Sequence, residues 1–418
     1  MDKEIAELIA KEEKRQKETI QLIAAENIAQ KDVLSPLSSI LVSKTAEGPI
    51  RDRHHSGCVV VDEVEKLAQD RAISLFGAKR AWLQPLSCNM ANLIVLTSIL
   101  KNGEKKPQDF RIMSMGLDQG GHFSHGSANH ISRMLCPNTK NYCVDKETGF
   151  LDYQKIKEMA EDYRPDILIC GASTYPREIN FAKMKEAADT CGAVLVADIA
   201  HTSGLVSAGV HVSPVPYCHF VTFSTYKAGG PKGGAILAGD PASEKSCQKI
   251  TEAVFPVVQS TPDFGSIAAK AAFFKECMGQ EYKETQRRII SNAKVLAEAL
   301  AQKGFQIATG GTDNHIVLID IKKSFGLTGK EADSRLEACG INANKTLLPY
   351  DSEGLDVGSG IRLGTNTVSR LGMGSEDMER IAGFIEEIIK SDMSDSFTRE
   401  MKNRIKEFMS KFSFDKFI

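Results

Sequence analysis

Short apolar runs alternate with segments of helical periodicity between about residue 60 and residue 270. Each run has the length of a buried strand, and each intervening segment is long enough for a helix. This alternation is typical of a mostly parallel sheet whose strands are joined by crossover helices. The sequence therefore predicts an α/β fold here. The runs are AWLQPLS, DFRIMSM, DILICGAST, GAVLVADIAH, HFVTFST and GGAILAG.

We expect three parts along the chain. The first is a helical arm, solvated or docked, because apolar and charged residues alternate at helical spacing from residue 3 to residue 24. The second is the large α/β domain. The third is a smaller α+β domain with the apolar run HIVLIDI, the strand SGIRLGT and helices near 329–338 and 375–390, and it begins in a long helix after Gly279. The predicted limits are 1–40, 41–280 and 281–418.

Charge and composition exclude several classes of function. The formal net charge of -2 provides no basic surface for nucleic acid or for an anionic membrane. No apolar run approaches the ~20 residues of a membrane span, and the stretch MDKEIAELIAKEEKRQKET is too charged for a secretory signal. The cysteines form no CxxC pair, so we expect neither a metal site nor a disulfide framework. These observations predict a cytoplasmic protein.

Lys227 stands at an unusual place for a lysine. The run HFVTFST before it has the character of a buried strand, and the segment AGGPKGG after it can only form a turn or loop. Lysine is normally a surface residue. In open α/β sheets, however, ligands bind outside the carboxyl ends of the strands, which is where Lys227 is predicted to lie.

Asp198 ends a second buried strand, AVLVA, and His201 follows it closely. One interpretation is a helix cap, because aspartate often caps the helix after a strand. The other pairs Asp198 with Lys227. An imine-forming lysine with an aspartate on a pyridinium nitrogen is the arrangement of an enzyme that uses pyridoxal 5'-phosphate (PLP). The aspartate keeps the ring nitrogen protonated, so that the ring can act as an electron sink.

Two further segments fit a PLP site. In PLSCNMAN, the residues Ser87, Cys88 and Asn89 precede or open an apolar helix, whose N-terminus is a natural phosphate site. An ordinary serine N-cap would leave the same pattern. In LDQGGHFSHGS, His122 could stack on the cofactor ring, although His122 and His125 could equally be two loop histidines.

Taken together, these residues belong to longer motifs that resemble the serine hydroxymethyltransferase family. The resemblance runs in order from about residue 20 to residue 390. It implies a PLP-dependent enzyme of fold type I, with an N-terminal arm, a large domain, a smaller C-terminal domain and active sites at a homodimer interface. The motifs are LIAAENIAQKDVLSPLSS, KTAEGPIRDRHHSGCVVVDEVEKLAQDRAISLFGA, GGHFSHGS, ADIAHTSGLVSAGV, AVFPVVQ, GGTDNHIVLIDI, LTGKEAD and SGIRLGT.

The resemblance also implies roles for individual residues. Lys227 matches the imine lysine, Asp198 the residue on the pyridine nitrogen, and His122 the stacking histidine. Arg362 matches the arginine that binds the substrate α-carboxylate, and Glu47 the glutamate that exchanges protons near the substrate hydroxyl. We further assign His54 and His55 to the substrate, with His55 in proton transfer. The remaining cofactor residues are Ser87, Cys88, Asn89, Ser173 (near the ring), His201, Ser260 and Thr261.

The departures from the family pattern gather around the substrate and folate sites. An imidazole can donate a hydrogen bond where a tyrosine did, but it also titrates near neutral pH. A shifted substrate or acceptor would account for changes confined to these sites. The departures are Ala25 for a serine, Thr45 for a tyrosine, His54 and His55 for a tyrosine pair, Phe123 for a leucine, Tyr226 for a histidine, Lys232 for an arginine, and Asn344-Lys345-Thr346 for Asn-Lys-Asn.

Three functions therefore stay open. The first is a PLP-dependent hydroxymethyltransferase that makes or breaks the Cα–Cβ bond of a β-hydroxy-α-amino acid, with serine and glycine as the default pair. The second is a folate-independent aldolase or transaldolase of a threonine-like amino acid. The third is a non-catalytic PLP-binding or regulatory paralogue. The residues do not decide whether tetrahydrofolate is used, nor between a dimer and a tetramer.

Overall fold

The computed structural model describes residues 2–101 and 105–417. The chain divides into two compact units, Asp32–Lys283 and the combination of Met1–Lys31 with Glu284–Ile418. The sequence predicted domain limits after residues 40 and 280, whereas the structure divides the chain after residues 31 and 283. The first 31 residues group with the C-terminal unit because their contacts lie there.

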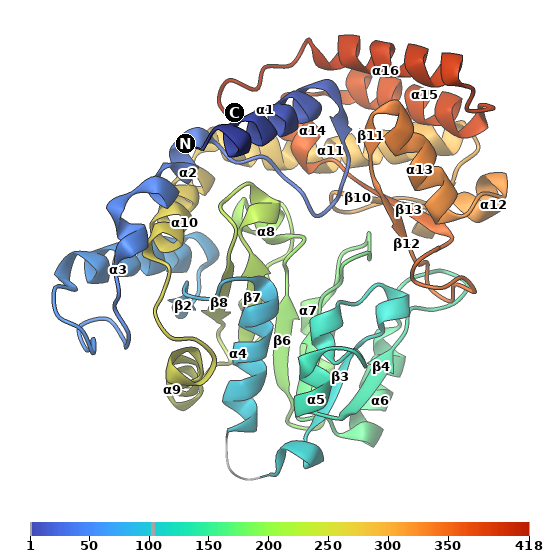
Figure 1. The fold of residues 1–418 in the computed structure, drawn as a ribbon. Coiled ribbons are helices and arrows are strands. Elements are labelled where there is room, and N and C mark those ends of the chain that lie inside the picture. The colour runs from blue at the N-terminus through green and yellow to red at the C-terminus, as the bar shows by residue number, and fades with distance from the viewer. Residues whose placement is uncertain (1, 102–104, 418) are drawn as a thin grey trace. The chain divides into compact units, whose positions relative to one another are not determined.

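A seven-stranded sheet forms the centre of the unit Asp32–Lys283, in the order β2-β8-β7-β6-β5-β3-β4 (Figure 1). The strands from β4 to β7 are parallel, and β8 runs antiparallel to both β2 and β7. This arrangement confirms the predicted α/β class. The strands are β2 (Arg80–Trp82), β3 (Arg111–Met115), β4 (Asn138–Tyr142), β5 (Ile167–Cys170), β6 (Val194–Asp198), β7 (Phe220–Ser224) and β8 (Gly234–Ala238).

Every predicted apolar run supplies one strand of this sheet, and β4 is the strand that the pattern missed. Its sequence NTKNY is polar, and only Tyr142 is fully buried. Because β4 lies at the edge and pairs with β3 alone, it needs no continuous apolar character. An edge strand carries a weaker sequence signal than an interior strand, which is covered on both faces.

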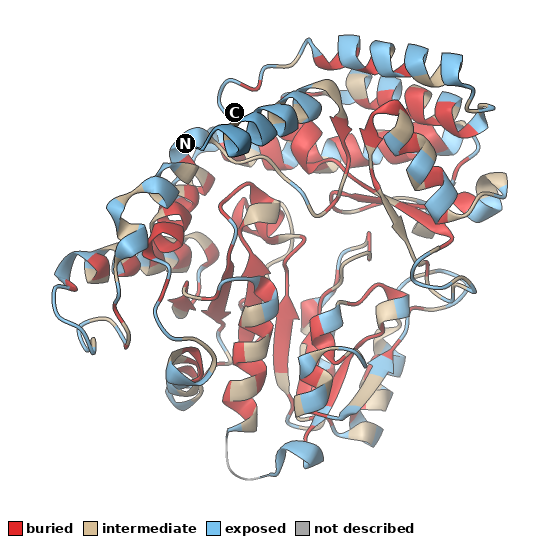
Figure 2. Cartoon of the chain, in the orientation of Figure 1, coloured by how far each residue is buried: buried red, intermediate tan, exposed pale blue. Residues whose placement is uncertain are grey.

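Helices cover both faces of the sheet, so its interior strands are buried except at the first residues of β3 and β6 (Figure 2). Along β6, Leu195 and Ala197 pack into one apolar cluster and Val196 into the other, as the alternation of side chains in a strand requires. The helix α4 packs against β7 and β8, and α3 packs against α10. The helices are α2 (Lys31–Leu34), α3 (Val59–Phe76), α4 (Cys88–Leu100), α5 (Ile131–Leu135), α6 (Tyr153–Tyr163), α7 (Phe181–Asp189), α8 (Ser203–Ser207), α9 (Glu244–Glu252) and α10 (Phe264–Cys277).

The C-terminal unit contains a four-stranded antiparallel sheet in the order β12-β13-β10-β9. The runs HIVLIDI and SGIRLGT, which were expected in this part of the chain, form its central pair. Within this unit β1 pairs with β11, which ties the N-terminal segment to the C-terminal half of the chain. The strands are β1 (Ile20–Gln21), β9 (Gln306–Ile307), β10 (Ile316–Asp320), β11 (Ile341–Asn342), β12 (Asn344–Thr346) and β13 (Gly360–Gly364).

Helices surround this smaller sheet. The predicted N-terminal helix forms, but it ends at Glu18 rather than near residue 24, and none of its residues is buried. The helices are α1 (Lys3–Glu18), α11 (Gln280–Gln302), α12 (Ile321–Phe325), α13 (Gly329–Cys339), α14 (Asn366–Arg370), α15 (Ser375–Lys390) and α16 (Asp395–Met409). Among the residues that the structure describes, no helix is both long enough and apolar enough to cross a membrane.

Candidate active site

Asp198 and Lys227 meet at the carboxyl edge of the large sheet. Asp198 is the last residue of β6, and Lys227 lies in a short turn directly after β7. The two strands are parallel neighbours, with Asp198 in register with Thr222, so their carboxyl ends fall at one edge. Both side chains line a cavity of about 140 Å³. The proximity expected from the two strand ends is therefore present.

Most of the residues that the sequence assigned to the cofactor line this same cavity. They come from the start of α4, from the loops after β3 and β5, and from the ends of β6 and β7. These elements are far apart in sequence but converge because their sheet strands are adjacent. The assigned residues in the lining are Ser87, Cys88, Asn89, His122, Ser173, Asp198, His201 and Lys227.

Asp198 is 7% exposed and accepts several hydrogen bonds. The amide nitrogen of Asn92 and Nε2 of His125 lie 2.7 and 2.9 Å from Oδ2, and the backbone N–H of Ala200 lies 2.9 Å from Oδ1. Burial by itself would raise the pKa of the Asp198 carboxyl. The hydrogen bonds from His125 and Asn92, with the electrostatic effect of His125, outweigh burial and hold that pKa well below its usual range. The carboxylate is therefore ionised at neutral pH.

Asn92 is a site residue that the sequence reasoning did not assign. Besides its bond to Asp198, it donates to the hydroxyl of Ser124 at 2.8 Å and accepts from the hydroxyl of Thr222 at 2.6 Å. The side chain thus joins α4, β6 and β7. Its sequence signal was an amide in an otherwise apolar helix, within the quoted segment PLSCNMAN.

His122 and His125 differ in their surroundings. His125 is buried against Asp198, and Nδ1 of His122 lies 2.7 Å from the hydroxyl of Ser124. Burial, with smaller contributions from His125 and Lys227 and against the pull of Asp198, lowers the pKa of His122 to about 4. His122 is thus a neutral ring on the cavity wall, which suits stacking on an aromatic cofactor.

The N-terminus of α4 also opens on the cavity. Ser87 is its N-cap, and its hydroxyl accepts from the backbone N–H of Met90 at 3.1 Å. The capping interpretation of Ser87 is therefore correct for its side chain. The first N–H groups of a helix have no partner within the helix, so Cys88 and Asn89 bring anion-binding donors to the cavity wall.

A second group of predicted residues is brought together elsewhere in the unit Asp32–Lys283. One carboxylate oxygen of Glu47 accepts from the hydroxyl of Ser260, and Oγ1 of Thr261 lies 3.4 Å from it. The backbone N–H of Glu47 points to Nδ1 of His55 at 3.4 Å. The bond from Ser260 and the charge of His55 lower the pKa of Glu47. None of these four residues lines the 140 Å³ cavity.

The remaining predicted substrate residues, Arg362 and His54, have other contacts. Arg362 belongs to the C-terminal unit, on β13, where its guanidinium donates to the side-chain oxygen of Asn344 at 2.9 Å. His54 stacks obliquely on Phe255, with ring centroids 5.3 Å apart. Tyr226 lines the Lys227 cavity, and the ammonium of Lys232 lies 4.0 Å from the centroid of its ring.

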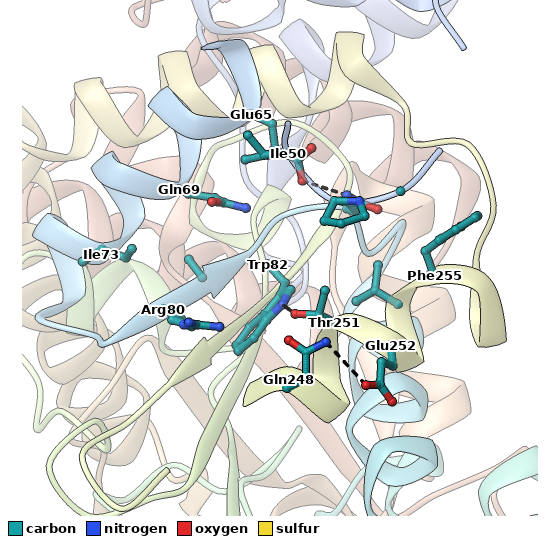
Figure 3. A pocket seen from close by; sticks show the side chains of 15 residues that line it. Ile50, Glu65, Gln69, Ile73, Arg80, Trp82, Gln248, Thr251, Glu252 and Phe255 are labelled. Atoms are coloured by element: carbon teal, nitrogen blue, oxygen red, sulfur yellow. Dashed lines mark hydrogen bonds between the residues drawn. The ribbon is translucent and has the colours of Figure 1, made fainter. Parts of the chain in front are cut away.

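A larger cavity of about 440 Å³ lies between α3, β2 and α9, and Figure 3 shows its lining. The indole N–H of Trp82 donates to the hydroxyl of Thr251 at 3.0 Å, and the amide of Gln84 donates to Glu65 at 2.8 Å. Four of its polar side chains are thus paired with each other. The smaller cavity at Lys227 is the better candidate for chemistry, because it contains an amine, an imidazole and a buried carboxylate together.

The residues that line the Lys227 cavity could in principle bind a metal ion or PLP. His122, His125 and Asp198 bring potential ligand atoms within 4.8 Å of one another, but the nearest atoms of His125 and Asp198 already bond each other. PLP fits better, since it needs an amine, a carboxylate at the ring nitrogen and phosphate donors. The thiol of Cys88, at 3.4 Å, is the weakest donor to Asp198, so a ring N–H can replace it.

A comparison with known protein families agrees with a PLP site in this cavity. The family model described as serine hydroxymethyltransferase matches residues 1–385 of this chain. The match includes every residue of the cavity and of the Glu47 group, and it also includes Arg362.

Proposed function

The chain belongs to the serine hydroxymethyltransferase family, and we propose that it makes or breaks the Cα–Cβ bond of a β-hydroxy-α-amino acid, with serine and glycine as the substrate pair. As a member of this family it is a PLP-dependent transferase of fold type I. The observation that carries the proposal is the convergence of Lys227, Asp198 and the N-terminus of α4 on one cavity.

Each residue of the cavity has a role that its surroundings support. Lys227 would hold the cofactor covalently, and the ionised Asp198 would keep the ring nitrogen protonated. The neutral ring of His122 would stack on the cofactor, and the N–H groups at the start of α4 would bind its phosphate. Bound there, PLP supplies an electron sink for negative charge at the substrate Cα.

The substrate contacts come from residues outside the cavity lining. Arg362 has a planar guanidinium that matches a carboxylate through two parallel bonds, so we assign it to the substrate α-carboxylate. Glu47 would accept the proton of the β-hydroxyl, because its carboxylate is ionised at neutral pH, and its hydrogen bond from Ser260 holds it in place. His55, beside it, would donate to the same oxygen.

We also propose a homodimer with the active site at its interface. The Glu47 group and the Lys227 cavity are two separate sites within one copy of the large unit, and a partner would bring a second Glu47 group to each cavity. Apolar side chains that a partner could cover are exposed on the same unit. They are Leu37, Ile40, Val42, Val59, Val60 and Leu67.

A cytoplasmic location is part of the same proposal. Its support is that all ten cysteines, each among the described residues, are free thiols. Free, mostly buried thiols suit a reducing compartment.

Borohydride reduction tests the assignment of Lys227. The reduced cofactor should remain on the peptide that contains Lys227, as peptide mapping by mass spectrometry would show. A cofactor trapped on another lysine would contradict the assignment.

Incubation with amino acids tests the reaction. The purified protein with PLP is given serine, with and without tetrahydrofolate, and glycine is quantified. We expect glycine from serine only when tetrahydrofolate is present. If neither serine nor threonine is converted although PLP is bound, the chain is a non-catalytic paralogue and the proposal fails.

A folate-independent aldolase or transaldolase is the second candidate. The observation that favours it is the replacement of a tyrosine pair by His54 and His55, together with Phe123 and Thr346 in the substrate and folate regions. Glycine formed from threonine without tetrahydrofolate, and none formed from serine, would select this function over the first.

A further inference from the structure

Lys270, on α10, is a buried cation that the proposed reaction does not use. It is 1% exposed, and its ammonium nitrogen lies 2.6 Å from the carbonyl oxygen of Leu83, 3.1 Å from that of Pro85 and 3.0 Å from that of Gly234. An ammonium has three protons to donate. Three carbonyl oxygens therefore match its donors.

The three carbonyls belong to the two segments that shape the cofactor cavity. Leu83 and Pro85 lie directly before Ser87, the N-cap of the proposed phosphate helix α4. Gly234 ends the glycine-rich segment that follows Lys227 and opens β8. The backbone N–H of Gly234 also donates to the carbonyl of Pro85 at 2.9 Å, so the two segments touch where Lys270 binds both.

The backbone around Gly233 and Gly234 packs closely against its neighbours. A Cβ atom on Gly234 would lie 2.2 Å from the carbonyl oxygen of Ser87, and one on Gly233 would lie 2.3 Å from Cε of Lys270. Only glycine allows this approach. The side chain of Lys270 thus fills a space that Gly233 leaves open, and Gly234 lets the backbone of Ser87 approach beside it.

Burial disfavours a charged ammonium at this position, so the presence of a lysine there indicates a specific role. Desolvation, partly offset by the charges of Asp263 and Glu65, lowers the pKa of Lys270 to about 7. The three carbonyl acceptors favour the protonated amine as well. A buried cation costs free energy even when it is hydrogen-bonded, and a methionine of similar volume would fill the same space without that cost.

We propose that Lys270 is a positioning residue for cofactor phosphate: its ammonium holds the segment before α4 against the segment after Lys227, and so fixes the phosphate donors relative to the covalent lysine. This inference rests on the proposed PLP site. The group recognised is the phosphate monoester, because the aldehyde and the ring are served by other residues.

Affinities for PLP and for pyridoxal, which lacks the phosphate, test the inference on the full-length apoprotein. Trp82 is the only tryptophan of the chain and lies just before Leu83, so quenching of its fluorescence reports binding without any turnover. For Lys270→Met we expect the Kd of PLP to rise about tenfold, because the phosphate donors would no longer be preorganised, and the Kd of pyridoxal to change less than about twofold.

Controls separate positioning from general stability. Lys275→Met removes an exposed lysine from the same helix and should leave both Kd values unchanged. Urea unfolding of each variant records stability independently. For Lys270→Ala, propylammonium replaces the missing part of the side chain and should restore the preference for PLP over pyridoxal, whereas 1-propanol should not. Should Lys270→Met fail to fold, Lys270→Gln carries the same comparison.

The outcomes are distinct. A lost preference for PLP over pyridoxal supports the inference. Equal weakening of both ligands, or no weakening, would show that Lys270 only stabilises the fold and would overturn it. A wild-type protein that binds neither ligand would instead overturn the proposed PLP site itself.

Discussion

At the scale of single residues, the site depends on charges whose cost of burial is offset by named partners. The Asp198 carboxylate is ionised although buried, since Asn92, His125 and the backbone of Ala200 all donate to it. The carboxylate is therefore ionised and hydrogen-bonded before any cofactor binds, as its proposed role beside a cationic ring nitrogen requires. Such preorganisation is what an electrostatic role requires.

Replacement of Asp198 tests the electrostatic role of its carboxylate. In Asp198→Ala, Asn92 and His125 lose their acceptor, and we expect a loss of roughly 3–5 kcal/mol in the free energy of unfolding, as for a broken buried ion pair. PLP affinity and turnover should fall with it. Asp198→Asn is the matched control, since it keeps an acceptor for Asn92 but no charge. Unchanged PLP affinity in both variants would contradict the assigned role.

The lowered pKa of His122 predicts how the stability of the apoprotein depends on pH. Its pKa of about 4 in the folded state lies below its ordinary value of 6.5, so the unfolded state binds more protons between these two pH values. The free energy of unfolding should therefore fall as the pH falls from about 6.5 to about 4, by about 3 kcal/mol. Urea unfolding at a series of pH values measures this.

Two histidine variants complete that experiment. His122→Asn should show a shallower fall than the wild type over the same pH range. His54→Asn, which changes an exposed imidazole, should reproduce the wild-type curve. An identical slope for His122→Asn and the wild type would rule out His122 as the source.

At the scale of elements, α3 holds the loop that carries Glu47. The guanidinium of Arg53 binds Asp62 at 2.8 Å and also binds Glu65, both on α3, and it donates to the carbonyl of Gly48, next to Glu47. The side chains of Arg53 and Glu65 are each 2% exposed. Glu65 in turn accepts from Gln84. A loop would otherwise be mobile, so these bonds define where the Glu47 carboxylate lies.

Arg53→Met should release this loop and leave Glu65 buried without its cation. We expect a loss of about 3–5 kcal/mol in the free energy of unfolding, measured by urea denaturation. The double variant Arg53→Met/Glu65→Gln removes the unpaired charge but keeps a partner for Gln84, so it should recover part of that loss. If the double variant is no more stable than Arg53→Met, the pair is not the cause.

At the scale of the whole molecule, the proposed dimer would complete each active site from two chains. A single copy of the large unit separates the Glu47 group from the Lys227 cavity. A twofold dimer places the same surface of each chain against the other, so two sites would form at once.

Mixed dimers test this sharing of residues. Lys227→Ala and Glu47→Gln should each have little activity alone. When equal amounts are dissociated and reassembled together, half of the dimers are hybrids with one intact site each, so about a quarter of the wild-type activity should return. Mixing either variant with itself is the control. No recovery in confirmed hybrids would mean that each chain supplies its own Glu47.

The sequence by itself determined the elements of this protein and the place of its two principal residues. The apolar runs predicted the strands of the large sheet except β4, because burial on both faces demands continuous apolar side chains. Asp198 and Lys227 could be paired because each follows such a run, and the carboxyl ends of parallel strands meet at one edge. The resemblance to a family supplied the remaining roles.

Only the tertiary structure decided which side chains support that edge. Asn92 joins Asp198 to Thr222, and Lys270 joins the segment before α4 to the segment after Lys227. The short strand β1 pairs with β11, from the other end of the chain. These contacts join residues far apart in sequence, and no local periodicity records them. Apolar patterning reflects burial alone, whereas the partner of a buried polar group is set by the packing of whole elements.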